Sequence, residues 1–187
     1  MLDDSYYKIL VVREPYSRLV SAFVDKFCTE EIKQKWVQHV IKSVRQEDGC
    51  EQPSITFRQF VDYLSTVEVS QLNRHWRPQS HTVQGIDLDI VIDLKYLAQG
   101  LKYLESKFNF DSSIDNTQRR QHHQYVNVDE STDWSDTKNI DIMQYKNKNG
   151  YFPDKELFYD DEIRKKVKLF YAEDFKLCEK AAQTFSV

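Results

Sequence analysis

Apolar residues near the start of the chain form one short unbroken run and then recur at helical spacing. Residues 6–12 combine aromatic and β-branched side chains, which is typical of a strand buried on both faces of a parallel sheet. Arg13-Glu14-Pro15 follows, and proline is best tolerated in the first turn of a helix. Apolar positions then recur every three or four residues up to Phe27, so we expect a helix over residues 15–27.

Two further amphipathic segments predict helices in the next part of the chain. Apolar residues at helical spacing indicate one helix over residues 32–44, and loop residues 49–53 separate it from the next. Thr56 and Gln59 have the spacing of a capping box, in which each side chain satisfies a backbone N–H of the other residue. We therefore expect a third helix that begins after Thr56 and ends near Ser65.

A second strand-then-helix unit is predicted in the middle of the chain. Residues 89–93 alternate between polar and apolar, and Asp93 is placed to cap a helix whose apolar face includes Leu97 and Leu104. Two such units among amphipathic helices predict an α/β fold in three layers, with a small parallel sheet flanked by helices.

Three stretches complete the pattern. Residues 73–85 lack periodicity, which is typical of a long surface loop of the kind that carries function. Residues 112–149 are polar and weakly patterned, so they predict no regular element. Residues 163–171 show the apolar spacing of a last helix.

The length and the net charge of the chain bound the number of domains and exclude one class of binding protein. A chain of 187 residues suffices for one domain with a substantial core, so we expect residues 1–187 to form a single domain. The net charge of -4 excludes a global positive field of the kind that binds nucleic acid. Any site for an anion must therefore be local.

Cysteine usage and hydropathy favour a cytoplasmic location. Cys28, Cys50 and Cys178 allow at most one disulfide and are too far apart for a metal-binding CxxC motif, so a reducing compartment is the simpler interpretation. No apolar run approaches the roughly 18 residues that a membrane span requires. His122 and His123 have no carboxylate or cysteine at ligand spacing, so we interpret them as surface residues and expect no metal.

The residues with the clearest chemical implication are Arg13 and Ser21. An arginine at the carboxyl end of a strand and a serine in the next helix can direct a guanidinium and a hydroxyl at one phosphate. Their place is the sheet edge, where α/β proteins bind ligands. The alternative is an arginine that caps its own turn and a serine on a solvated helix face. Both interpretations fit these two residues taken alone.

The surrounding motif resembles a known family. Arg-Glu-Pro-x-x-Arg-x-x-Ser-Ala after an apolar strand resembles the 3′-phosphate-binding segment of sulfotransferases that use 3′-phosphoadenosine 5′-phosphosulfate, above all the carbohydrate sulfotransferases of sulfotransferase family 2. Later segments look like further parts of that family, in the same order: residues 56–64, 73–79 and 170–175. The resemblance covers nearly the whole chain. It implies that Arg13 and Ser21 hold the 3′-phosphate of the nucleotide, with Arg18 as a third member.

The resemblance also implies a reaction. A sulfuryl group would pass in line from 3′-phosphoadenosine 5′-phosphosulfate to a hydroxyl of a carbohydrate or similar acceptor, with a general base on that hydroxyl. His75 is the candidate base, and the alternative is a structural histidine beside a core Trp76. Arg74 and Arg77 flank it as candidates for binding an anionic sugar, or else as charged residues of a solvated loop.

One part of the family's pattern is missing from the sequence. Family members carry a loop of the form Pro-Lys-x-Gly-x-Thr that cradles the 5′-phosphosulfate, and none of the four glycines lies in such a setting. We therefore expect either an N-terminally truncated form of a larger P-loop-like enzyme or a non-catalytic remnant that binds a nucleotide or glycan. Uncovered sheet surface would then favour self-association. A mostly helical interaction protein is the remaining alternative.

Overall fold

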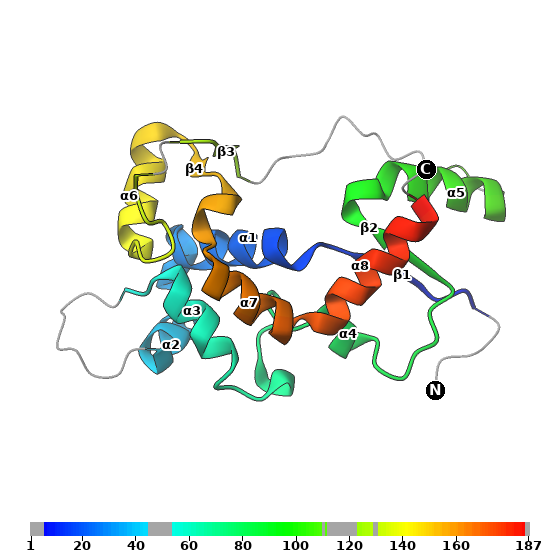
Figure 1. The fold of residues 1–187 in the computed structure, drawn as a ribbon, viewed down its shortest axis with the longest axis horizontal. Coiled ribbons are helices and arrows are strands. Elements are labelled where there is room, and N and C mark those ends of the chain that lie inside the picture. The colour runs from blue at the N-terminus through cyan, green and yellow to red at the C-terminus, as the bar shows by residue number, and fades with distance from the viewer. Residues whose placement is uncertain (1–5, 45–53, 110, 112–122, 129–130, 186–187) are drawn as a thin grey trace. The chain divides into compact units, whose positions relative to one another are not determined.

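Figure 1 shows the computed structural model of the chain, which describes residues 6–44, 54–109, 111, 123–128 and 131–185. Helices and small parallel sheets make up these residues, in agreement with the predicted α/β class. The chain divides into two compact units. We call Met1–Pro15, Arg77–Arg120 and Tyr171–Val187 the sheet unit, and Tyr16–Trp76 with Gln121–Phe170 the helical unit. The expectation of a single domain stays a prediction.

The sheet unit is built on two parallel strands, β1 (Ile9–Val12) and β2 (Ile90–Asp93). In their register Ile9 lies opposite Ile90 and Val12 lies opposite Asp93. Helix α8 (Ala172–Phe185) packs against both strands and α5 (Leu97–Phe108) packs against β2 (Figure 1). The remaining elements of this unit are short: α4 (Gln79–Thr82) and the 3₁₀ helix η3 (Leu94–Tyr96).

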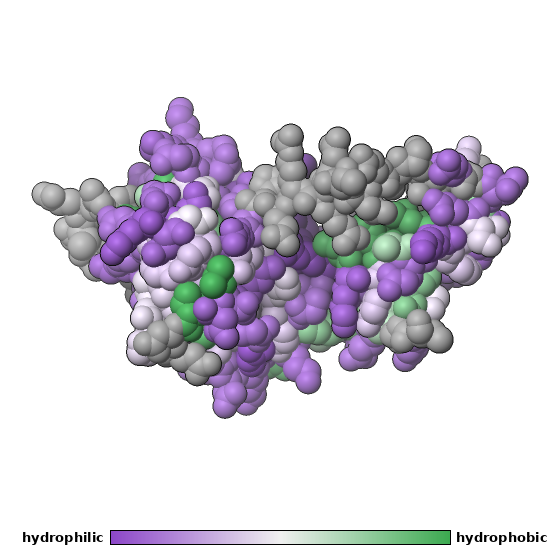
Figure 2. Space-filling view, turned by 90° about the horizontal axis from the view of Figure 1, so that it is seen from above, coloured by the Kyte–Doolittle hydropathy of each residue, from purple (hydrophilic) through white to green (hydrophobic). Residues whose placement is uncertain are grey.

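The core of the sheet unit lies on both faces of β2, because Val91 points to one face and Ile90 and Ile92 point to the other. Cys178 and Ala181 of α8 pack with Val12 and Val91, while Phe185 packs with Ile90, Ile92 and Leu104. On β1, Ile9 is 40% exposed and Val11 is 47% exposed. Hydrophobic surface is visible over this part of the molecule in Figure 2.

The predicted strand at residues 6–12 is therefore confirmed over Ile9–Val12, but its burial on both faces was wrong. Among the described residues β1 pairs with β2 alone. Strands buried on both faces need cover from both sides. The exposed fractions show that the face carrying Ile9 and Val11 lacks such cover.

The helical unit contains most of the helices and a second parallel pair of strands, β3 with β4. Its elements are α1 (Pro15–Phe27), η1 (Glu30–Lys33), α2 (Lys35–Val44), α3 (Phe57–Leu64), η2 (Val69–Gln71), β3 (Tyr125–Val126), α6 (Asn139–Asn149), β4 (Phe152–Pro153), η5 (Lys155–Phe158) and α7 (Asp161–Phe170). Pro15 begins α1 and is the last residue of its segment of the sheet unit.

Aromatic rings form the centre of the helical unit. Phe60 of α3 lies 5.6 Å from Phe23 and 5.1 Å from Phe27, both on α1, measured between ring centroids. Its ring also meets Trp76 edge-on at 5.3 Å. Phe158 meets the ring of Phe23 at 6.5 Å. Such tilted and edge-to-face pairs add to the stabilisation that burial alone provides.

Several predicted elements are confirmed by the structure. The helix expected over residues 15–27 is α1, with the same bounds. The capping box of Thr56 and Gln59 is present at the start of α3, and the side chain of Asp93 accepts a hydrogen bond from the Lys95 N–H to cap η3, just before α5. The predicted loop at residues 49–53 lies outside the described residues.

Three expectations need correction. The last helix is two helices, α7 and α8, with Tyr171 between them. The loop over residues 73–85 contains α4, and Trp76 within it is 1% exposed because its ring packs among those of the core. The polar stretch 112–149 contains α6, which is anchored by the buried Asn139: its side chain accepts from the Ile55 N–H and donates to the Phe27 carbonyl.

Candidate functional site

Arg13 directly follows β1, and one side-chain amide holds its main chain. The Arg13 N–H donates to Oε1 of Gln79 at 3.0 Å, and Nε2 of Gln79 donates to the Arg13 carbonyl at 2.9 Å. A neighbouring antiparallel strand makes the same pair of bonds to a residue opposite it. The amide therefore fixes the course of the backbone at Arg13 just beyond the sheet, because the pairing of β1 with β2 ends at Val12 and Asp93.

Asp174 on α8 holds Gln79 in turn. Its carboxylate accepts from the backbone N–H of Gln79 and of Ser80, both at 2.8 Å, and from Nε2 of Gln79 at 3.2 Å. The Asp174 side chain is fully buried, so these bonds are shielded from water. Asp174 thus acts as a cap at the start of α4 and connects α8 to the segment that holds Arg13.

Ser21 lies in the helical unit on one polar face of α1. Ser17, Ser21 and Asp25 are four residues apart and therefore point to the same side of the helix. Oγ of Ser21 lies 3.4 Å from the hydroxyl of Tyr125, and the Lys155 ammonium donates to Oγ of Ser17 at 2.9 Å. The same ammonium lies 4.5 Å from the Tyr125 ring centroid. A cation and a second hydroxyl therefore accompany Ser21.

Sequence reasoning did not identify Tyr125 and Lys155 as neighbours of Ser21. They come from the segment around β3 and β4, which follows α1 by more than a hundred residues. The sequence did contain a signal for a polar site at this position. Ser17, Ser21 and Asp25 are spaced four residues apart, which places them on one polar face of α1.

The far end of this face carries charged groups. Nε2 of His123 lies 3.2 Å from Oδ1 of Asp25, whose other oxygen pairs with Lys26 at 2.7 Å. Burial alone would raise the pKa of Asp25, but hydrogen bonds and charges from Lys26 and His123 lower it overall. His123 was expected at the surface and is instead 13% exposed, because it pairs with Asp25 and packs edge-on against Phe152. His122 lies outside the described residues.

His75 and two arginines meet in the helical unit. Arg18 of α1 donates from Nη2 to the Arg74 carbonyl at 2.9 Å, and the His75 N–H donates to Oδ1 of Asn73 at 3.0 Å. Partial burial, followed by the positive charges of Lys26, Arg74 and Arg18, lowers the pKa of His75, against an opposing effect of Asp25. The imidazole is therefore neutral near pH 7 and able to accept a proton.

The predicted residues are thus distributed between the two units. Arg13 and Arg77 belong to the sheet unit. Arg77 lies two residues before Gln79, whose amide binds the Arg13 main chain. Ser21, Arg18, Arg74 and His75 belong to the helical unit. Arg18, Arg74 and His75 are brought together there, and the Arg18 guanidinium donates to the backbone carbonyl of Arg74.

Thiol and metal chemistry receive little support from the described residues. Cys28 and Cys178 are free thiols and both are buried, whereas Cys50 lies outside the described residues. Burial, followed by the carboxylates of Asp93, Glu14 and Asp174, raises the pKa of Cys178 to about 12.

Among the described residues no three His, Cys, Asp or Glu side chains are grouped to hold a metal ion. The helices of the described part of the chain are too short or too polar to span a membrane. The expected absence of a metal and the cytoplasmic location stay predictions.

Comparison with known proteins places this arrangement in a family. A sequence model described as the sulfotransferase family matches residues 1–179. Carbohydrate sulfotransferase 14 of Homo sapiens is 34% identical over 82 residues, which are 42% of this chain and 22% of that protein. Carbohydrate sulfotransferase 10 of Mus musculus is 31% identical over 107 residues, 51% of this chain and 28% of that protein.

The matched segments therefore span less than a third of these two relatives. No solved structure matches the chain. Since the family match runs through both compact units and covers nearly every residue, the chain belongs to the sulfotransferase family.

Proposed function

We propose that this chain is part of a carbohydrate sulfotransferase, which transfers a sulfuryl group from 3′-phosphoadenosine 5′-phosphosulfate to a hydroxyl of a carbohydrate. Family membership and the two carbohydrate sulfotransferase relatives support this class of reaction. We propose that the chain has the three-layer, P-loop-like fold of the family. Because the sequence holds no Pro-Lys-x-Gly-x-Thr loop, we assign to these residues the 3′-phosphate part of the nucleotide site.

The observation that carries this assignment is the set of hydrogen bonds from Gln79 to the Arg13 main chain, with Gln79 held by Asp174. We call this set the clamp on Arg13. A residue that binds phosphate does so more tightly when it is positioned beforehand, since ordering a long side chain on binding costs free energy. Gln79 and Asp174 fix the backbone from which the Arg13 guanidinium extends. We propose that this guanidinium and the Ser21 hydroxyl donate to the 3′-phosphate. Arg18 is the proposed third contact, besides its bond to the Arg74 carbonyl.

His75 is the proposed general base. Its lowered pKa leaves the imidazole neutral at pH 7, so it can take the proton from the acceptor hydroxyl as that oxygen attacks sulfur. The sulfur–oxygen bond to the nucleotide's phosphate breaks in the same in-line step, and the nucleotide leaves as 3′-phosphoadenosine 5′-phosphate. Arg74 and Arg77 are the proposed contacts for an anionic acceptor sugar.

A non-catalytic protein that binds a nucleotide or glycan is the second candidate. These 187 residues include no Pro-Lys-x-Gly-x-Thr loop to stabilise the leaving phosphate, so in this case they would bind the nucleotide without turnover. Both candidates require a working 3′-phosphate site, so nucleotide binding is tested first and turnover separates them.

Calorimetry with the full chain tests the phosphate site. We expect 3′-phosphoadenosine 5′-phosphate to bind detectably better than AMP, which lacks the 3′-phosphate. Arg13→Ala should weaken binding about tenfold to a hundredfold, because charge-assisted hydrogen bonds contribute roughly 1.5–3 kcal/mol. Ser21→Ala should cost about 1 kcal/mol, since a neutral hydroxyl is a weaker donor.

The Arg13→Ala variant should keep its fold, because the clamp bonds involve only main-chain atoms of Arg13. Lys102→Ala is a matched control, since Lys102 is exposed on α5 of the same unit. Equal affinity for the two nucleotides, or an Arg13→Ala chain that binds as well as the parent, would refute the assignment.

A further inference from the structure

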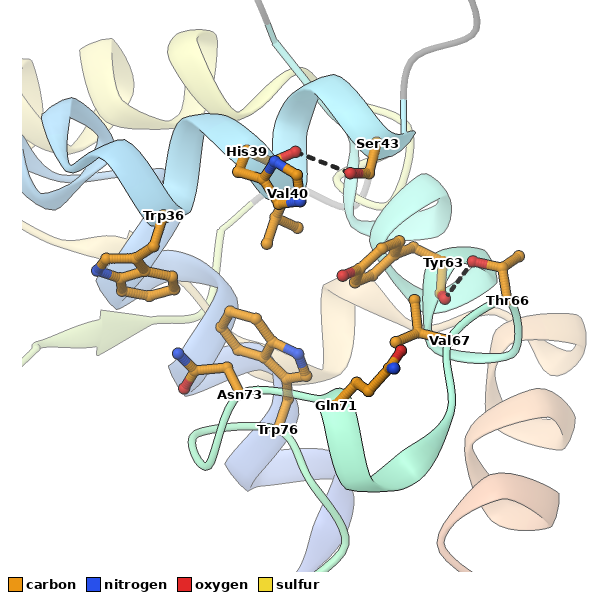
Figure 3. A pocket seen from close by; sticks show the side chains of 10 residues that line it. All are labelled: Trp36, His39, Val40, Ser43, Tyr63, Thr66, Val67, Gln71, Asn73 and Trp76. Carbon is orange, nitrogen blue, oxygen red and sulfur yellow. Dashed lines mark hydrogen bonds between the residues drawn. The ribbon is translucent and has the colours of Figure 1, made fainter.

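A cavity in the helical unit is lined by none of the residues assigned above, although its lining residues Asn73 and Trp76 flank Arg74 and His75 in the chain. It has a volume of about 510 Å³ and is lined by α2, α3, η2 and the segment that follows η2 (Figure 3). This volume is in the range of pockets that hold small organic ligands. Four of its lining residues carry rings: Trp36, His39, Tyr63 and Trp76.

Two indole rings form a fixed apolar platform in this cavity. Trp36 and Trp76 lie 5.8 Å apart between centroids, with their planes inclined by 35°. Trp76 is held from behind by Phe27 at 5.8 Å and by Phe60 at 5.3 Å. The Trp36 indole N–H donates to Oε1 of Gln34 at 2.8 Å, which orients its ring. Trp76 is 1% exposed, so it backs the platform, and the half-buried Trp36 provides the ring on which a ligand can stack without first ordering it.

Neutral hydrogen-bonding groups surround the platform. Figure 3 shows the Tyr63 hydroxyl directed toward the space between Val40 and Trp76, with the amide of Gln71 close to it. Asn73 lies on the opposite side of Trp76. Among the described residues that line the cavity, none carries a carboxylate, an ammonium or a guanidinium group. The lining thus combines apolar faces with uncharged donors and acceptors.

We infer that this cavity binds an uncharged sugar residue of a glycan. A pyranose presents C–H groups on its faces and hydroxyls on its edge, so one face can stack on the Trp36 indole while the hydroxyls bond to the tyrosine and amide groups. A charged sugar would find no counter-ion in the described lining and would lose hydration on entry. This inference rests on the proposed function, because it gives the acceptor a second point of attachment, separate from Arg74 and Arg77.

Calorimetry of the full chain with cellobiose and with N,N′-diacetylchitobiose tests the inference without any nucleotide present. We expect weak binding of at least one disaccharide, accompanied by a change in tryptophan fluorescence. Trp36→Ala should weaken this binding about fivefold to tenfold, which corresponds to the loss of one aromatic contact. Gln71→Ala, at an exposed position, should weaken it about threefold through the loss of a hydrogen bond.

Lys42→Ala is the matched control, because Lys42 is exposed on α2 and does not line the cavity. If neither disaccharide binds, or if Trp36→Ala and Gln71→Ala both bind as the parent does, the inference is wrong. Adenosine binding that depends on Trp36, without sugar binding, would also overturn it, because the platform would then serve a nucleobase. Nucleotide binding through Arg13 with no sugar binding would leave the proposed function intact, whereas sugar binding without nucleotide binding would leave only this inference.

Discussion

The helical unit and the sheet unit are stabilised in different ways. In the helical unit, aromatic rings from α1, α3 and η5 meet in one continuous core around Phe23 and Phe60. The sheet unit has two small apolar clusters beside its two strands and leaves one face of β1 exposed. Its connection between α8 and the end of β1 is polar and depends on the buried Asp174.

The two units therefore differ in what their main interactions do. Apolar packing stabilises the fold, whereas hydrogen bonds position Arg13, the residue proposed to bind phosphate. Apolar packing is non-directional, so it stabilises a unit without fixing any one backbone group. Hydrogen bonds are directional, and the clamp uses them where the direction of Arg13 matters. We therefore expect substitutions in the two units to affect stability and nucleotide binding in different proportions.

Truncating a ring in the aromatic core should have the largest effect. Phe60→Ala removes four ring contacts at a fully buried position and should lower the free energy of unfolding by about 3–5 kcal/mol. Chemical denaturation followed by circular dichroism measures this loss. Leu169→Ala serves as the control, since its side chain is 71% exposed on α7 and should change stability by less than about 0.5 kcal/mol. Similar losses for the two variants would show that the rings do not form the principal core.

Removing the buried carboxylate should have a smaller effect on stability and a clear effect on binding. Asp174→Ala leaves the N–H groups of Gln79 and Ser80 without their acceptor and should cost about 2–3 kcal/mol of stability. Affinity for 3′-phosphoadenosine 5′-phosphate should fall as well, because Gln79 would no longer be held against Arg13. Asp174→Asn keeps one carbonyl oxygen as acceptor and should recover part of both losses. Unchanged nucleotide affinity in Asp174→Ala at a temperature where the chain stays folded would contradict a positioning role for the clamp.

The smallest effect concerns His75 in the helical unit. Its pKa should lie below the ordinary value of about 6.5, since partial burial and nearby cations both disfavour the imidazolium form. An NMR pH titration should therefore place its midpoint below 6.5, and Lys26→Met should move that midpoint upward by removing the positive charge with the largest effect on the imidazole. Lys42→Met is the control on α2. A midpoint at or above 6.5 in the parent chain would remove the electrostatic argument for His75 as a base.

Elements with strong local signals could be predicted from the sequence. The helix α1 has a proline in its first turn and regular apolar spacing, and α3 has a complete capping box, so both were located with their bounds. Helix α6 could not be predicted, because it buries little apolar surface and is anchored through Asn139 to distant backbone groups. The division at Tyr171 was also missed, since the apolar spacing continues through it.

The candidate site was predictable only in part for the same reason. Arg13 and Ser21 stood out because they lie in one short motif between a strand and a helix. Gln79 meets Arg13 from 66 residues away and Asp174 meets Gln79 from 95 residues away, and nothing in their local sequence indicates which backbone groups they bind. Contacts of this kind depend on the fold as a whole and become visible only in three dimensions.

The amide of Gln79 has one further consequence. A carboxylic acid in its place could donate to the Arg13 carbonyl only while protonated, and an imidazole would exchange its donor and acceptor character on titration. An amide supplies a donor and an acceptor together and has no protonation equilibrium at the pH values where proteins fold. The two bonds between Gln79 and the Arg13 main chain therefore contain no titratable group, and acidity can reach the end of β1 only through the Asp174 carboxylate that holds Gln79.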